Sequence, residues 1–145
     1  MPESFDFAHA PGHLIRRAQQ FAVSVFTERM STFGVTPVQF AVLNAVMDTP
    51  GIDQVTLSNR VAFDAATSGS VIGRLESKGW IRREAHAKDR RRKMLWLTPQ
   101  GERATLEMKP QVTLVQNQIL DSLDVDEQKR LMELLVKLVN VQSST

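Results

Sequence analysis

The sequence has no cysteine and no long run of apolar residues. Without thiols the chain forms no disulfide, builds no thiolate metal site and has no cysteine that could sense oxidants. No apolar stretch approaches the roughly 20 residues needed to span a bilayer, and no basic segment leads into an apolar one near the start. We therefore expect a cytoplasmic protein that is not bound to a membrane.

The sequence also has few residues that could hold a metal ion or catalyse a reaction. Its three histidines are His9, His13 and His86, and Pro11 and Gly12 separate the first two. This spacing does not match the clustered ligands of zinc or manganese sensors, although a metal-responsive regulator stays open as an alternative. No Ser-His-Asp order, phosphate-binding glycine loop or close carboxylate pair stands out. The sequence therefore predicts no enzyme, no cofactor and no metal site.

Positive charge is concentrated between residues 72 and 93. Nine lysines and arginines lie there against three acidic residues, an excess of six on a chain whose formal net charge is +2. Cations gathered on one surface are typical of proteins that bind polyanions. The simpler interpretation is a solvated run of charge, and the order of the flanking elements argues against it. The nine cations are Arg74, Lys78, Arg82, Arg83, Lys88, Arg90, Arg91, Arg92 and Lys93.

The first half of the chain shows helical periodicity separated by breaks. An apolar stripe from Leu14 to Phe33 predicts a first helix, which we expect to end at Gly34. Thr36 and Gln39 flank a proline in the pattern of a capping box, which predicts the start of a second helix. Composition agrees with a globular fold, because 42% of the 145 residues are hydrophobic and 23% are charged.

A helix pair and a hairpin follow. Asp53 and Asp64 can each cap a short helix, and Lys78 with Gly79 suits the end of the second one. After residue 80 the hydrophobic period changes to alternation, which predicts strands over about residues 81–85 and 94–98 joined by a basic loop. Such a two-stranded hairpin is too small to be stable unless it packs against helices.

The C-terminal part reads as two further helices. Thr98 precedes a proline in the pattern of a helix start, and Asp124 with Glu127 forms another capping signal. Pro110 lies inside the first of these helices and is expected to kink or interrupt it. The predicted fold class is mainly α with a small β-hairpin wing, a winged helix-turn-helix with dimerisation helices at both termini.

A helix pair followed by a basic hairpin suits double-stranded DNA. The second helix fits the major groove, and the hairpin tip can place an arginine in a narrow minor groove. Small and polar residues on that helix let it approach the bases closely. The predicted DNA-binding residues are Thr56, Ser58, Ala66, Thr67, Ser68, Gly69, Ser70, Arg74, Lys88, Asp89, Arg90, Arg91 and Arg92.

These residues resemble a known family. The run DAATSGSVIGRLESKGWIRREAHAKDRRRKMLWLTPQGE and the upstream VTPVQFAVL are similar to the MarR family of winged helix-turn-helix regulators. The resemblance implies a dimer with interlocked terminal helices and two lobes that bind a palindromic operator. It also implies that Asp89 braces the wing and that Arg91 enters the minor groove. Gly69 and Ser70 depart from the larger polar or basic residues that the family often carries there, which affects the expected base preference.

Dimerisation has support from the residues as well. The first helix is apolar over a broad arc, and the last carries Leu131, Leu134, Leu135, Leu138 and Val139 within nine residues. One core could absorb one of these stripes, but absorbing both at opposite ends of the chain is less natural. We expect residues 1–35 to form an N-terminal dimerisation helix, 36–100 the DNA-binding lobe and 101–145 the C-terminal dimerisation helices, all in one intertwined domain. The two lobes would then bind half-sites roughly 34–36 Å apart.

The resemblance further implies a small-molecule effector, often an aromatic acid, held between the dimerisation helices and the DNA-binding lobe. A cation and an imidazole beside an aromatic ring could hold a carboxylate against an apolar wall. The stretch from Pro11 to Arg17 is also similar to regulators of aromatic-acid breakdown. The alternative is a polar stripe that faces solvent or the partner subunit. The predicted ligand-binding residues are His9, His13, Arg16, Arg17, Gln20 and Phe40.

Together these features predict a sequence-specific DNA-binding transcriptional regulator. We expect a repressor rather than an activator, released from a palindromic operator by a small molecule, with an aromatic carboxylate as the candidate. An effector-independent or architectural DNA-binding protein is the main alternative, and an interaction module that binds no nucleic acid is the second.

Overall fold

The computed structural model describes residues 4–61 and 64–143. Six α-helices, a short 3-10 helix and three strands follow one another in these segments. In chain order they are η1 (Phe7–His9), α1 (Pro11–Arg29), α2 (Pro37–Asp48), β1 (Ile52–Asp53), α3 (Gln54–Arg60), α4 (Ala65–Ser77), β2 (Ile81–Ala85), β3 (Lys93–Leu97), α5 (Pro99–Leu120) and α6 (Val125–Ser143).

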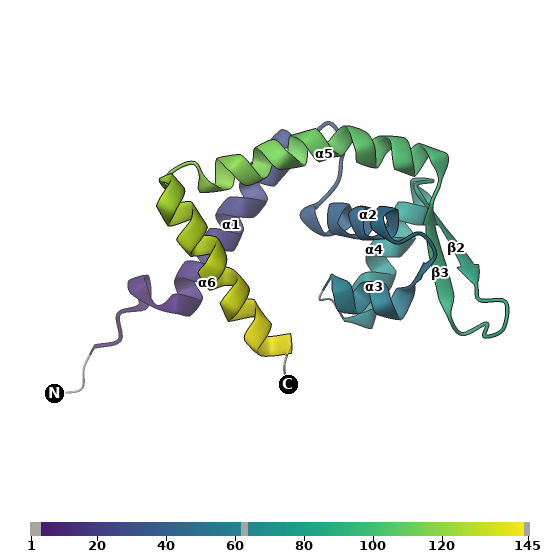
Figure 1. The fold of residues 1–145 in the computed structure, drawn as a ribbon, viewed down its shortest axis with the longest axis horizontal. Helices are drawn as coiled ribbons and strands as arrows, with labels where there is room; N and C mark the ends of the chain where they lie inside the picture. The colour runs from purple at the N-terminus through teal and green to yellow at the C-terminus, as the bar shows by residue number, and fades with distance from the viewer. Residues whose placement is uncertain (1–3, 62–63, 144–145) are drawn as a thin grey trace.

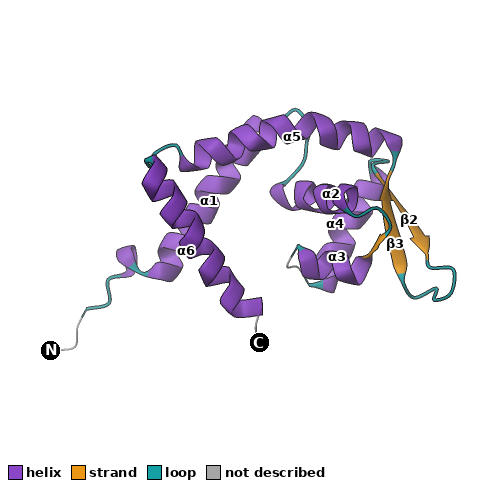
Figure 2. Cartoon of the chain, viewed as in Figure 1, coloured by secondary structure: helices purple, strands orange, loops and turns teal. Residues whose placement is uncertain are grey.

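The elements form an arch (Figure 1). Helix α5 runs along the top, α1 and α6 form one limb, and a lobe of α2, α3, α4 and the sheet forms the other. The hairpin of β2 and β3 projects from the far side of this lobe (Figure 2). This arrangement confirms the predicted mainly helical fold with a small wing. No helix in the described segments is both long and apolar enough to cross a membrane.

Side-chain caps start the helices at the predicted residues. Thr36 and Gln39 form a reciprocal capping box at the start of α2, with both hydrogen bonds at 3.1 Å. Asp53 and Asp64 accept from the third amide of α3 and α4 at 2.8 and 2.7 Å. Thr98 does the same for α5, at 3.0 Å from the Gly101 amide. The sequence therefore predicts these starts correctly, because a cap is a local interaction.

The sheet has a third strand that the sequence analysis did not predict. The hairpin pairs β2 with β3 in the order β1-β3-β2, and β1 adds two residues to the other edge of β3. Ile52 lies opposite Leu95 in this added pair, and both side chains are buried. The predicted two-stranded hairpin is therefore confirmed, but the sheet to which it belongs has one strand more than the sequence indicated. Strand β1 anchors the base of the wing to the start of α3.

One hydrophobic core holds the lobe to α1 and α5. Ile72 and Leu75 on α4 are fully buried with Leu57 of α3, Leu95 of β3 and Met108 of α5. Side chains from α1 and α2 complete the same cluster. Apolar contacts therefore fix α3, α4 and the hairpin to α5.

The predicted end of the first helix at Gly34 is wrong, and Pro110 does not interrupt its helix. Helix α1 ends at Arg29, and Gly34, with φ +64°, lies beyond it in a turn. Helix α5 continues through Pro110 without interruption. The carbonyl that this proline leaves without an intrahelical donor belongs to Leu106, which is exposed, so water can satisfy it.

The apolar stripe of α6 is not absorbed by the core of the protomer. Its side chains stay exposed although the helix is amphipathic, and apolar residues of α1 and of the segment before it share this exposure. They are Phe5, Phe7, Leu14, Ile15, Phe21, Met132, Leu134, Leu135, Val136, Leu138 and Val139. The interpretation that a single core covers the stripes at both ends is therefore wrong.

Candidate DNA-binding interface

Helix α4 presents one polar stripe to solvent. Its buried side carries Ile72 and Leu75, whereas Ala66, Ser70 and Arg74 are exposed at intervals of four residues. Thr67 is exposed beside the first of them. Residues four apart lie on the same face of a helix, so these side chains form one continuous surface.

Three of the predicted DNA-binding residues do not belong to this exposed surface. Ser68 is fully buried, and its hydroxyl has no hydrogen-bond partner among the described residues. Ser58 is 7% exposed and donates to the carbonyl of Gln54 at 2.9 Å. Gly69 is half-buried, on the side of α4 that faces Gln54. The prediction that both serines face a groove is wrong, because α4 and α3 turn these positions toward the lobe.

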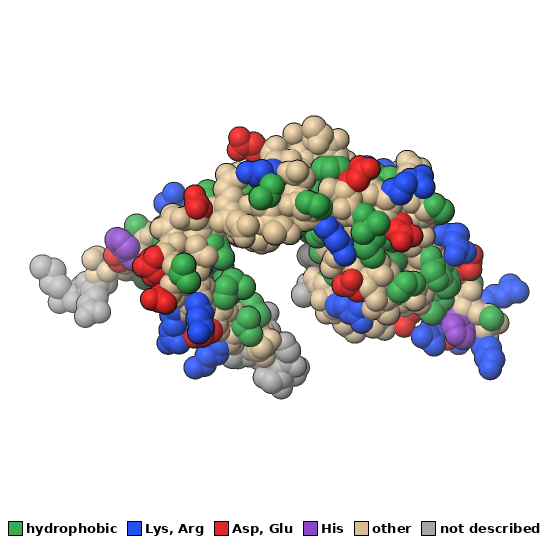
Figure 3. Space-filling view, turned by 45° about the horizontal axis from the view of Figure 1, so that its top comes forward, with side chains coloured by type: hydrophobic (Ala, Val, Ile, Leu, Met, Phe, Trp, Pro, Cys, Tyr) green, Lys and Arg blue, Asp and Glu red, His purple; other side chains and the backbone are tan. Residues whose placement is uncertain are grey.

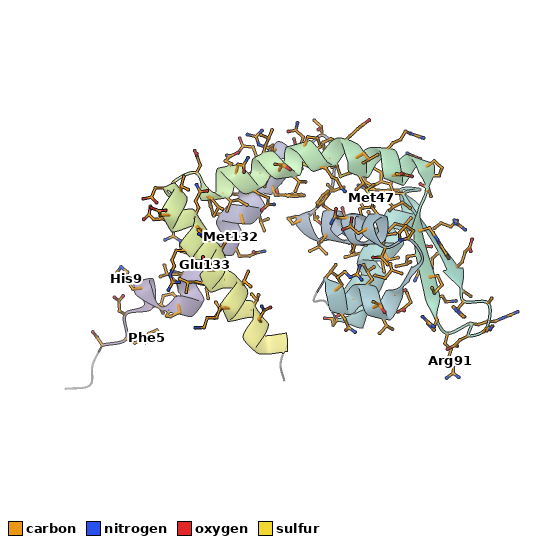
Figure 4. All side chains as sticks on the ribbon, in the orientation of Figure 1. Phe5, His9, Met47, Arg91, Met132 and Glu133 are labelled. Atoms are coloured by element: carbon orange, nitrogen blue, oxygen red, sulfur yellow. The ribbon has the colours of Figure 1, made fainter. Side chains whose placement is uncertain are left out.

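The tip of the wing is braced by its own hydrogen bonds. The Asp89 carboxylate accepts from the Arg91 amide at 3.1 Å, and the Asp89 carbonyl accepts from the Arg92 amide at 3.0 Å. The His86 ring accepts from the amides of Lys88 and Asp89. The side chain of Arg91 is 98% exposed and extends away from the hairpin (Figure 4). The turn is thus ordered while its arginine is free to reach outward.

Four of the nine clustered cations are engaged within the protein. Lys78 donates to the Gly34 carbonyl at 2.7 Å, and Arg92 pairs with Asp53 at 3.1 Å. The other two pairs join Arg82 to Glu84 and Arg83 to Glu76. Sequence spacing could not reveal these pairings, because several partners come from other elements.

The remaining cations have no close ionic partner among the described residues. Arg91 comes only within 3.9 Å of Asp89, and its four companions make no ion pair. Positive side chains gather at the wing end of the lobe (Figure 3). These free cations are Arg74, Lys88, Arg90, Arg91 and Lys93. These five, rather than all nine cations of the cluster, are therefore the candidates for binding a polyanion.

Two of the free cations, Arg91 and Lys93, border the same hollow as the start of α4. A cavity of about 680 Å³ lies between α3 and the wing, and its wall includes Asp64, the N-cap of α4, together with Arg91 and Lys93. The wing tip and the N-terminal end of α4 therefore lie on the same side of the lobe. A duplex that entered by this side would meet both.

The two capping aspartates of this side stay ionised. Hydrogen bonding from the Thr56 amide is the main reason that the pKa of Asp53 is lowered. Burial opposes this effect, and the Thr56 hydroxyl and Arg92 lower the pKa further. The Thr67 amide lowers the pKa of Asp64 in the same way. Thr56, a predicted DNA-binding residue, donates its hydroxyl to the Asp53 carboxylate at 2.9 Å. The residue as a whole is exposed.

Comparison with known proteins assigns this arrangement to a family. The family model described as "MarR family" matches residues 33–92. The transcriptional regulator HosA of Escherichia coli is 37% identical over 106 residues, which cover 73% of this chain and 78% of HosA. The chain belongs to the MarR family.

Solved MarR-like structures agree with this membership over almost the whole chain. The PcaV regulator from Streptomyces coelicolor, in complex with its natural ligand, has a TM-score of 0.88 and 33% identity, covering 95% of this chain and 97% of its own. BpsR of Bordetella bronchiseptica, whose DNA binding is regulated by 6-hydroxynicotinic acid, has a TM-score of 0.89 and 30% identity, with 94% and 98% covered. This MarR family protein is a DNA-binding transcriptional regulator, not an enzyme.

The predicted ligand-binding residues are only partly brought together. Arg16 donates to the His13 ring at 2.9 Å, and Arg16 and Gln20 line one open hollow of about 580 Å³ along α1. His9 is exposed before α1 and contacts Asp6 at 2.7 Å. Arg17 is exposed on α1, whereas Phe40 packs against the core from α2. Among the described residues, no hydrogen bond or ring contact joins Phe40 to the other five.

A second, smaller hollow lies where α1, α2 and α5 meet. It measures about 140 Å³ and is walled by Phe26 and Gln19 of α1, Pro37 of α2, and Val115 and Ile119 of α5. None of these residues was predicted as a ligand contact, because the sequence does not show which faces of three separate helices converge. No cluster of three potential metal ligands occurs within residues 4–61 and 64–143.

Two further residues on the side of the lobe that bears the hollow were not predicted from the sequence. Lys93 was counted in the basic cluster but was not among the predicted DNA-binding residues, although it borders the hollow with Arg91. Its place as the first residue of β3, next to the loop, was the available signal. Gln54 was missed as well, and no local pattern marks it.

Proposed function

We propose that this MarR family protein is a homodimeric repressor that binds a palindromic operator and leaves it when a small aromatic carboxylate binds. The observation that carries the DNA-binding part is the set of five free cations on α4 and the wing. Arg91 and Lys93 line the hollow beside the start of α4, Arg74 lies on the exposed stripe in the last turn of α4, and none of the five forms an ion pair closer than 3.9 Å among the described residues. That surface suits the phosphates on both sides of a groove.

The exposed apolar stripe of α6 supports the dimer. Leu134, Leu135 and Leu138 are each at least 40% exposed in the protomer, and Ile15 of α1 is 52% exposed. An apolar surface of this extent is costly in water unless a partner covers it. A second copy offers the same stripe, which is the geometry of a two-fold interface.

A two-fold symmetric dimer would bind a palindromic operator. Two identical lobes related by a two-fold axis bind identical half-sites, separated by about one helical turn of DNA. Each α4 would place Thr67, Ser70 and Arg74 in a major groove, and each Arg91 would enter the neighbouring minor groove. The protein would repress transcription if the operator overlaps a promoter. Release of the DNA would then depend on the distance between the two lobes.

The effector part rests on the relatives and on the α1 hollow. BpsR is regulated by a hydroxylated pyridine carboxylate, and PcaV was solved with its natural ligand. Arg16 and Gln20 line the α1 hollow, with His13 held beside Arg16. A guanidinium can hold a carboxylate through paired hydrogen bonds. Binding would release DNA only if the ligand favours a lobe spacing that misfits the operator.

A release experiment tests this proposal. The probe is a duplex that the full-length protein selects from fragments of its own genome, and the ligands are 6-hydroxynicotinic, benzoic and hydroxybenzoic acids. We expect at least one acid to lower the affinity for the duplex in fluorescence anisotropy. We expect Arg16→Ala to abolish this release while sparing DNA affinity, because Arg16 lines the α1 hollow, and Arg130→Ala on α6 to change neither.

Two results would contradict parts of the proposal. Binding that no acid reverses supports the alternative of an effector-independent DNA-binding protein. Loss of both DNA affinity and release in Arg16→Ala, or of neither, removes Arg16 from the ligand site.

A further inference from the structure

Three side chains join α4, the helix proposed to enter the major groove, to α3 and the wing. They lie away from the exposed stripe of α4. The Arg83 guanidinium pairs with the Glu76 carboxylate and donates to the Gln54 side-chain oxygen at 3.2 Å. Glu76 lies on α4, Gln54 on α3 and Arg83 on β2. The side chains of Arg83 and Glu76 are 28% and 33% exposed, so the bridge is partly screened from solvent.

The bridge touches α4 at two levels along its length. Besides the Glu76 pair, the amide nitrogen of Gln54 would lie 3.6 Å from a Cβ built on Gly69. Gly69 precedes Glu76 by seven residues, which is two helical turns, so both positions lie on the same face of α4. That face is next to the exposed stripe of Ser70 and Arg74 rather than part of it.

We propose that the bridge of Arg83, Glu76 and Gln54, here called the α4 bridge, sets the angle of the recognition helix relative to the wing and thereby controls sequence specificity. Its members are positioning residues. The proposal rests on the proposed operator binding and adds a division of work. Free cations supply affinity for any duplex, and the bridge aligns α4 for base contacts.

The chemistry of the bridge supports this division. Arg83 is held by two acceptors from two elements, and a guanidinium with several fixed hydrogen bonds is rigidly oriented. Contacts to phosphates position a protein without reading sequence, and they tolerate small rotations of a helix. Hydrogen bonds to base edges weaken steeply when their angles change. Loosening the bridge should therefore reduce specific binding and leave non-specific binding in place.

Glu76→Gln tests the proposal against a matched control, Glu84→Gln. Both substitutions remove one negative charge from the basic region, but Glu84 pairs only with Arg82 on the same strand. The probes are a duplex that the full-length wild-type protein selects from a randomised pool and a scrambled duplex of equal length. The measurement is the affinity for each duplex at several salt concentrations.

We expect both variants to bind the scrambled duplex equally, at or above the wild-type level, because each loses a repulsive charge. Relative to Glu84→Gln, Glu76→Gln should bind the selected duplex about tenfold more weakly, on the scale of one lost base contact. Its salt slope should be unchanged, because no phosphate contact is removed. The ratio of the two affinities does not depend on the folded fraction, so lower stability alone cannot produce this result.

Arg83→Met gives a second test if Glu76→Gln folds poorly, with Arg82→Met as its control. The specificity ratio should fall in Arg83→Met and hold in Arg82→Met. Equal ratios in the paired variants would overturn the α4 bridge while leaving operator binding intact. A wild-type protein that selects no duplex over the scrambled one would overturn operator binding and the bridge together.

Discussion

Among single residues, the structure separates cations without a close ion pair, which we propose bind DNA, from cations that hold the lobe together. Four of the cations bind partners within the protein: Lys78, Arg82, Arg83 and Arg92. Charge density alone could not make this distinction, since all nine cations lie within 22 consecutive positions. Arg91, predicted from the family pattern, stays exposed on a braced turn.

Arg91→Ala is expected to weaken binding to the selected duplex by about 1–3 kcal/mol, the scale of one good specific contact. If Arg91 also neutralises a phosphate, the salt slope falls by about 0.9. Affinity measured by fluorescence anisotropy over a salt series gives both quantities. Arg82→Gln serves as the control because its charge is already paired, and it should lose much less. Unchanged affinity in Arg91→Ala would remove this residue from the interface.

The capping carboxylate of Asp53 leads to a prediction about pH. The pKa of Asp53 is lowered in the folded state, chiefly by the Thr56 amide. Its contribution to stability is therefore present above the ordinary aspartate pKa of about 3.8, and is lost as the pH falls through the lowered value. Asp53→Asn keeps a cap but cannot ionise, so its stability should fall less steeply in acid. Asp53→Ala should cost about 1 kcal/mol at pH 7.

Thermal unfolding between pH 7 and pH 2.5 measures these differences. Parallel stability curves for the wild type and Asp53→Asn would show that Asp53 gains nothing from its ionised form in the folded state.

Among helices and strands, the features set by neighbouring residues are predicted from the sequence. Those set by pairing with distant residues are not. The caps at Thr36, Asp53, Asp64 and Thr98 depend on residues three positions away, and all four were predicted. Strand β1 has two residues and exists only because it pairs with β3, more than 40 positions later. No periodicity can reveal so short a strand.

The junction between the wing and α5 shows the same dependence on distant contacts. A Cβ added at Gly101 would lie 2.1 Å from the carbonyl oxygen of Trp80, whereas one at Gly73 on α4 would meet nothing within 4 Å. Gly101→Ala should therefore destabilise the protein by about 1–3 kcal/mol or more, because backbone must move. Gly73→Ala should stabilise it by about 0.5–1 kcal/mol, because alanine favours a helix.

Denaturant unfolding of both glycine variants checks this pair of predictions. A Gly101→Ala variant with the free energy of unfolding of the wild type would contradict the close approach of Gly101 to the Trp80 backbone.

At the scale of the whole molecule, the arch leaves one limb without a partner. The lobe has a closed core, but α6 and the start of α1 expose apolar side chains along much of their length. The sequence indicated that two terminal stripes exceed what one core absorbs, and the exposed α6 agrees with that interpretation. Which surfaces of two copies meet could not be predicted, because that depends on shape.

Leu138→Glu on α6 is expected to dissociate the proposed dimer, because it places a charge within the apolar stripe. Asn140→Glu adds the same charge to an exposed polar position of the same helix and should leave the dimer intact. Sedimentation velocity across a range of concentrations distinguishes dimer from monomer. A wild-type protein that stays monomeric at micromolar concentration would contradict the dimer.

In the proposed function, free cations of α4 and the wing hold a duplex against the lobe. The salt dependence of binding to the selected duplex measures this electrostatic contribution. With several phosphates contacted by each of two protomers, affinity should fall about a thousandfold or more between 50 and 200 mM salt. Affinity that barely changes over this range, or no binding to duplex DNA at either salt concentration, would contradict it.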